Sequence, residues 1–155
     1  MILAALLYIR KVTATTTVAR VTEDYVEEGS AHSLQINELP DGVAMFRIHG
    51  PFLFGATDKL SILEEVMDSL PKVVMLRLRN MTAIDATGLH ALERLADNLK
   101  KSGRHLVVCG MRDQPAKLMN QAEFHRHLGD TNIVATLKEG IARAKELLSQ
   151  ETPAA

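Results

Sequence analysis

The chain has 155 residues, of which 46% are apolar, so it has the length of one globular domain with an ordinary buried core. Its 18 basic and 19 acidic residues nearly cancel, which leaves a net charge of -1 and argues against a nucleic-acid partner. The single cysteine, Cys109, excludes an internal disulfide framework and is expected to be a buried, unreactive thiol in a reducing compartment.

The first nine residues are almost entirely apolar, and Arg10 and Lys11 follow them directly. About 20 apolar residues are needed to cross a bilayer, and a secretory signal carries its positive charge before the apolar run. Residues 1–12 are therefore interpreted as the end of a transmembrane helix or as an amphipathic segment at the membrane. Basic residues after an apolar segment favour the cytoplasmic side. The alternative is an amino-terminal helix that packs on its own domain.

Residues 13–33 are rich in threonine and in small or charged side chains without a sustained period, which predicts a linker. The domain proper is expected over residues 34–151, and residues 152–155 are expected to form a tail. The domain should open with a hairpin, because the turn signal "PDG" lies between the strand-like runs "LQINEL" and "VAMFRIH". The first two strands are then antiparallel.

After the hairpin, helices are expected to alternate with strands. Helical spacing predicts helices at 58–70, where Pro71 ends the pattern, at 86–102, in "QPAKLMNQAEF", and from 137 to about 150. Strands are predicted at 72–79, where periodicity alone leaves a buried helical turn open, and in "RHLVVCG" and "NIVA". Together these elements predict an α/β layer structure with about four helices and a mixed sheet of about five strands.

A polar turn, "AIDATG", precedes the helix at 86–102. Asp85 occupies the N-cap position, where its carboxylate can accept the amide hydrogens of Thr87 or Gly88, an interaction worth about 1 kcal/mol. The same helix start favours an anion such as a phosphoryl group, and the charge of Asp85 would oppose it. A helix cap alone and a ligand site both remain open interpretations.

No arrangement typical of a metal or nucleotide enzyme accompanies this turn. His125 and His127 in "HRH" come nearest to a metal site, but no cysteine or third histidine lies at ligand spacing, so they are interpreted as surface histidines. The glycine-containing stretch "HGPFLFG" lacks the Gly-Lys-Ser/Thr of a P-loop. The sequence therefore predicts neither a metal centre nor a catalytic site.

The order of the elements over Leu34–Leu148 and the turn "AIDATGLHAL" resemble the STAS domain. Anti-sigma factor antagonists share this domain with the carboxyl-terminal cytoplasmic part of SulP/SLC26-type anion transporters. The turn resembles the family's Asp-Ser-Ser/Thr-Gly loop through Asp85, Thr87 and Gly88. The stretch "HGPFLFGA" resembles the family's segment between the second strand and the first helix through Gly50, Phe54 and Ala56.

Departures from the family pattern favour the transporter branch. Antagonists carry a serine after the aspartate, which a partner kinase phosphorylates, and this chain has Ala86 there. Thr87 is the remaining hydroxyl and is kept as a candidate phosphorylation site. Arg77 stands at the end of the preceding strand, where antagonists commonly have an aspartate. The apolar amino-terminal segment agrees with this branch, in which Met1 would not be the natural start of the protein.

The resemblance implies a non-catalytic regulatory domain on the cytoplasmic side of the inner (plasma) membrane. Its expected partners are the membrane domain of a transporter for sulfate or a related anion, other cytosolic proteins, and the membrane through residues 1–12. A dimer is expected in the full-length transporter. No resident cofactor is implied. Weak nucleotide or anion binding is expected at Gly50, Pro51, Phe52, Phe54, Asp85, Ala86, Thr87 and Gly88. The alternatives are a stand-alone partner-switch protein like the antagonists, and a small hydrolase or transferase.

Overall fold

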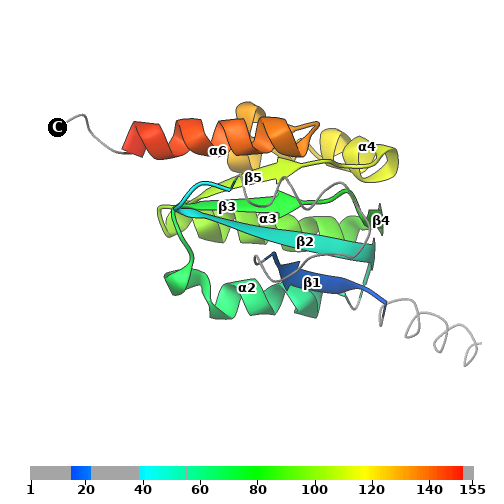
Figure 1. The fold of residues 1–155 in the computed structure, drawn as a ribbon. Coiled ribbons are helices and arrows are strands. Elements are labelled where there is room, and N and C mark those ends of the chain that lie inside the picture. Colours follow the sequence, from blue (N-terminus) through cyan, green and yellow to red (C-terminus); the bar gives the residue numbers. More distant parts are fainter. Residues whose placement is uncertain (1–14, 22–38, 55, 152–155) are drawn as a thin grey trace, which may run out of the picture.

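The structure is a computed structural model that describes residues 15–21, 39–54 and 56–151 (Figure 1). Two predicted segments, the membrane-associated stretch at 1–12 and the tail at 152–155, lie outside the described residues. In the part of the chain that is described, no helix is both long and apolar enough to cross a membrane.

One mixed sheet forms the centre of the domain. Its described strands follow the order β1-β2-β3-β5-β6, and β4 pairs with the carboxyl end of β2. Strands β1 and β2 are antiparallel, and the other described pairs are parallel. The strands are β1 (Thr17–Arg20), β2 (Val43–Phe52), β3 (Val73–Arg77), β4 (Met81–Ile84), β5 (His105–Cys109) and β6 (Ile133–Val134).

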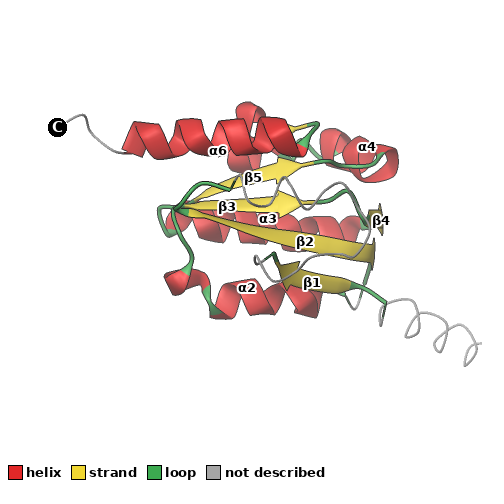
Figure 2. Cartoon of the chain, in the orientation of Figure 1, coloured by secondary structure: helices red, strands yellow, loops and turns green. Residues whose placement is uncertain are grey.

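Helices cover both faces of this sheet. Figures 1 and 2 show the helices α2 and α3 on one face and α6 on the other. The described α-helices are α2 (Ser61–Glu65), α3 (Ala86–Lys101), α4 (Asp113–Gln121), α5 (His125–Leu128) and α6 (Leu137–Glu151). Short 3-10 helices are η2 (Thr57–Leu60), η3 (Met67–Ser69) and η4 (Asp130–Asn132).

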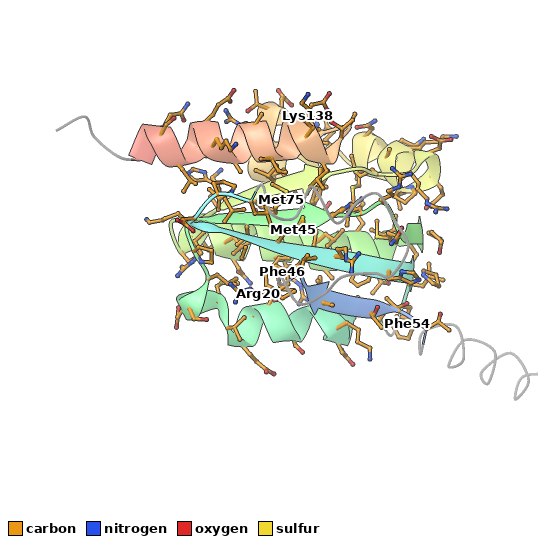
Figure 3. The ribbon with its side chains drawn as sticks, in the orientation of Figure 1. Arg20, Met45, Phe46, Phe54, Met75 and Lys138 are labelled. Carbon is orange, nitrogen blue, oxygen red and sulfur yellow. The ribbon has the colours of Figure 1, made fainter. Side chains whose placement is uncertain are left out.

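Two apolar cores follow from the alternation of side chains along the strands. Met45 and Met75 face α6, whereas Phe46 points to the opposite face, toward α2 and α3 (Figure 3). On α3, the predicted apolar stripe is buried in this second core, with Leu92 and Leu95 fully enclosed. Side chains on both faces of the central strands are therefore buried, which explains why "VVMLR" reads as an unbroken apolar run up to its arginine.

The predicted antiparallel opening of the sheet is confirmed, but β1 lies in an unexpected place. Thr17–Arg20 pair with β2 although the sequence assigned residues 13–33 to a linker, so that assignment is wrong for this strand. Only Val18 is a buried apolar residue of β1, and its neighbours in the strand are exposed. So short a pattern gives too little alternation to indicate a strand. Residues 34–38, most of the predicted first strand, lie outside the described residues.

The prediction of one continuous helix at 58–70 is wrong. The chain there forms η2, α2 and η3 in succession. The hydroxyl of Ser61 donates to the carbonyl of Asp58, and the hydroxyl of Ser69 donates to the carbonyl of Val66 at 2.8 Å. Such side-chain bonds compete with the helical ladder. Pro71 ends the segment as predicted, with Leu70 extended before it.

The remaining elements match the sequence closely. The strand at 72–79 and the helix at 86–102 are confirmed as β3 and α3, and the predicted helix from 137 is α6. Strand β4 and helix α5 were not predicted. Strand β4 has only four residues, and α5 is one short turn that starts directly after the buried Phe124.

Candidate functional site

The pairing of β4 with β2 brings the two predicted site segments together. Gly50 of β2 lies opposite Met81, and Phe52 lies opposite Ile84, the residue before Asp85. The segment after β2 and the turn before α3 are therefore neighbours in the fold. The irregular register between Gly50 and Phe52 marks a bulge at the point where β2 leaves β3 and joins β4.

Asp85 is the N-cap of α3, as predicted, and it has a second role. Its Oδ1 accepts a hydrogen bond from the amide of Gly88 at 2.8 Å. Its Oδ2 accepts one from the amide of Phe54 at 2.9 Å. One carboxylate therefore caps the helix and also ties the end of the β2 segment to it. Hydrogen bonds to a charged group contribute roughly 1.5–3 kcal/mol each, less where they are exposed.

Two glycines at this turn are explained by close packing. A Cβ on Gly88 would lie 2.4 Å from the carbonyl oxygen of Phe52 and 2.9 Å from its ring. Gly50 has a φ of +88°, and a Cβ there would lie 3.0 Å from the carbonyl oxygen of Thr15. The absence of side chains lets α3 and the residues just before β1 approach β2 closely, so both glycines have a structural reason that requires no ligand.

The outer side of the turn is accessible. The side chain of Phe54 is 69% exposed and lies at the periphery of the domain near the start of β1 (Figure 3). Ala86 and Thr87 are also exposed, whereas Phe52 is fully buried and Pro51 is half-buried. The exposed residues Phe54, Ala86 and Thr87 form what we call the turn surface.

Two contacts that support the turn were missed by sequence reasoning. The amide side chain of Gln114, on α4, donates to the carbonyl of Ile84 at 2.9 Å and accepts from its amide at 3.0 Å. The hydroxyl of Thr16 donates to the carbonyl of Pro51. Each contact joins residues at least 30 positions apart, and neither residue type carries a local signal of that role.

Cys109, His125 and His127 are the other groups that the sequence singled out. Cys109 is buried, and burial raises the pKa of its thiol to about 11, although the nearby Arg77 opposes the rise. A thiol that stays protonated is a poor nucleophile. His127 lies 2.9 Å from Asp97 through Nδ1, whereas His125 faces Asp130 at 3.9 Å. Among the described residues, no group of three metal-binding side chains converges.

Nucleotide or anion binding at the turn remains a prediction. Asp85 already accepts the amide of Gly88, one of those that a phosphate at this helix start would contact, and its charge opposes an anion. The described part of the site is a partly apolar, exposed surface at the start of a capped helix.

Comparison with known proteins identifies the family. The sequence model of the STAS domain matches residues 36–140. A sulfate transporter family protein from Wolinella succinogenes is 35% identical, with a TM-score of 0.66 over 72% of this chain and 91% of that chain. The STAS domain of a SulP transporter from Vibrio cholerae is 21% identical, with a TM-score of 0.66 over 77% of this chain and 97% of that domain.

A curated relative, the putative sulfate transporter YvdB of Bacillus subtilis (strain 168), is 24% identical over 131 residues. The match covers 83% of this chain but 23% of the relative, so the chain spans less than a quarter of that protein's length. The family model covers more than half of the chain, and the sheet with its antiparallel opening fits the fold that the resemblance implied. The chain therefore belongs to the STAS domain family.

Proposed function

We propose that the chain is the cytoplasmic STAS domain of a SulP-type anion transporter, where it regulates the transporter without catalysing a reaction. The observation that carries the proposal is the likeness to a sulfate transporter family protein, which extends over nearly all of that protein's solved chain. The membrane domain would carry sulfate or a related anion, and this domain would lie at the cytoplasmic side of the inner (plasma) membrane.

The start of α3 supports the transporter branch over a stand-alone antagonist. Ala86 is exposed at the position where antagonists carry the serine that their kinase phosphorylates, and it has no hydroxyl. Thr87 is exposed at the neighbouring position and is kept as a weaker candidate acceptor. A switch that depends on phosphorylation after Asp85 therefore lacks its usual acceptor in this chain.

We further propose that the turn surface docks the domain to the membrane part of the transporter or to another cytosolic protein. Phe54 is the largest exposed apolar side chain among the described residues, and aromatic side chains are enriched in interface cores. Its backbone amide donates a hydrogen bond to Asp85, which restrains the backbone at this residue before a partner covers the ring.

The size and location of the protein in its own cells test the first part of the proposal. An antibody raised against the purified chain should detect a polypeptide several times longer than 155 residues, as the curated relative is, in the membrane fraction. Detection of a 17.1 kDa protein in the soluble fraction alone would favour the stand-alone partner-switch protein.

Transport measurements test the docking surface. In the full-length protein, Phe54→Ser should lower sulfate uptake about fivefold, which corresponds to about 1 kcal/mol of lost docking free energy. Val66→Ser is the matched control, because Val66 is exposed to 39% at the end of α2, outside the turn surface. Equal uptake by both variants and the unaltered protein would contradict docking through Phe54.

A further inference from the structure

A second candidate ligand-binding region lies where β3, β5 and β6 end. A pocket of about 610 Å³ opens there. Its described lining comes from the end of β3, from the segment after β5, and from the residues that lead into α6: Arg77, Arg79, Cys109, Gly110, Met111, Arg112, Ala135, Thr136, Leu137 and Lys138. Ligands of open α/β sheets commonly bind beyond the carboxyl ends of the strands, in pockets of roughly 300–1,000 Å³.

Positive charge distinguishes this pocket, which we call the basic pocket. Four of its described lining residues are cations, namely Arg77, Arg79, Arg112 and Lys138, and none is acidic. The whole chain has a net charge of -1, so the cluster is a local excess and does not reflect a basic protein. Figure 3 shows Lys138 at the amino end of α6.

One of the four cations is buried, and the other three are exposed, where a ligand can contact them. Arg77 is only 8% exposed at the end of β3. The positive charge of its guanidinium lowers the pKa of the Cys109 thiol, which lies at the end of the adjacent strand. Arg79, Arg112 and Lys138 are exposed at the rim. The Nε of Arg112 donates to the carbonyl of Arg79 at 2.8 Å, which orients two loops without neutralising either guanidinium.

Glu139, the residue after Lys138, has a carboxylate that already accepts hydrogen bonds from the backbone. The Oε2 atom of Glu139 accepts hydrogen bonds from the amides of Ala135 and Thr136, both at 3.0 Å, and so caps α6. This carboxylate is not part of the described pocket lining. The two amides that it occupies, those of Ala135 and Thr136, precede Leu137, the first residue of α6. The four cations of the lining supply the charge that attracts an anion.

We propose that the basic pocket binds a small molecule that carries phosphate or sulfate groups. The planar guanidinium forks of Arg79 and Arg112 match the oxygens of such groups, and Lys138 adds a point charge from the first turn of α6. The volume exceeds what a free oxyanion needs and admits a mononucleotide. The inference uses residues other than those of the turn surface and stands independently of the transporter proposal.

Calorimetric titration of the purified full chain at low ionic strength tests the proposal. The probes are inorganic phosphate, sulfate and ADP, with chloride as the control anion. The double variant Arg79→Gln/Lys138→Gln should lower the affinity for phosphate and ADP by about tenfold or more, since two charge-assisted contacts are lost. Lys145→Gln, an exposed charge on the same helix, should change the affinity less than about twofold.

The probes also separate two sources of the same chemistry. Equal affinity for phosphate and ADP would identify the oxyanion itself as the ligand, whereas tighter ADP binding would identify a larger phosphorylated molecule; both results support the pocket. Failure of all probes to bind at millimolar concentration, or equal binding by the double variant, would overturn the proposal. Thermal melts of the variants without ligand, which should match the unaltered chain, confirm that each is folded.

Discussion

The starts of α3 and α6 are both capped by acidic side chains, but the turn surface at α3 has no charged side chain, whereas cations line the pocket at the start of α6. At α3, the Asp85 carboxylate accepts two amides and faces the exposed Phe54 segment. At α6, Glu139 also accepts two amides, but four cations line the adjacent pocket. Each helix start offers similar backbone chemistry. The side chains around a helix start therefore decide whether it is suited to contact with a protein partner or to binding of an anion.

The largest expected effect concerns packing at the α3 start. Gly88→Ala should lower the free energy of unfolding by about 3 kcal/mol, because the added methyl group would overlap the carbonyl of Phe52. Thr87→Ala, an exposed change in the same turn, should cost less than about 0.5 kcal/mol. Urea unfolding of both variants checks this. A stable Gly88→Ala protein would mean that the turn is more adaptable than its contacts indicate.

The next effect separates the two roles of Asp85. Asp85→Ala should cost about 2 kcal/mol, because both the helix cap and the link to Phe54 are lost. Asp85→Asn should cost about 1 kcal/mol, since an amide has one acceptor oxygen and can serve only one of the two donors. Thermal or urea unfolding measures the difference. Equal stability of Asp85→Asn and the unaltered chain would show that the Phe54 bond contributes little.

A smaller effect distinguishes the two regions as anion sites. Glu139→Gln removes a negative charge near the basic pocket while keeping an acceptor for the cap, so phosphate affinity should rise about threefold. Asp85→Asn should leave that affinity unchanged. If Asp85→Asn instead tightens phosphate binding and Glu139→Gln does not, the anion site lies at the turn. Calorimetric titration with inorganic phosphate reads out both variants.

The smallest expected signal is phosphorylation at the turn. Incubated with an anti-sigma-type kinase, the unaltered chain should take up little phosphate, because Ala86 has no hydroxyl. Ala86→Ser should become a weak substrate, and mass spectrometry of the α3 start would detect it. Stoichiometric modification of Thr87 in the unaltered chain would favour the partner-switch alternative.

Much of the fold could be predicted because its signals are local. The amphipathic stripe of α3 and the N-cap at Asp85 depend on residues within a few positions of one another, and both are confirmed. Strands β1 and β4 were missed because each has four residues and little alternation of burial. What makes them strands is their pairing with β2, which no local pattern reveals.

The candidate sites also depend on contacts between residues that are distant along the chain, and no local sequence pattern reveals such contacts. The resemblance directed attention to Gly50 and Gly88, whose close contacts are structural, and to Asp85, whose cap was foreseen but whose bond to Phe54 was not. The basic pocket was not foreseen. Its residues come from three segments that are distant along the chain, at 77–79, 109–112 and 135–138, and the parallel alignment of β3, β5 and β6 brings them together.

The contact between Gln114 and Ile84 has a consequence for association between copies of this chain. A short strand with unpaired amide and carbonyl groups is a template on which another polypeptide can add a strand. Gln114 gives both backbone groups of Ile84 the partners that a neighbouring strand would supply. The side chain of Gln114 therefore blocks the edge of β4 at Ile84. A second molecule that added a strand there would first have to displace the Gln114 amide.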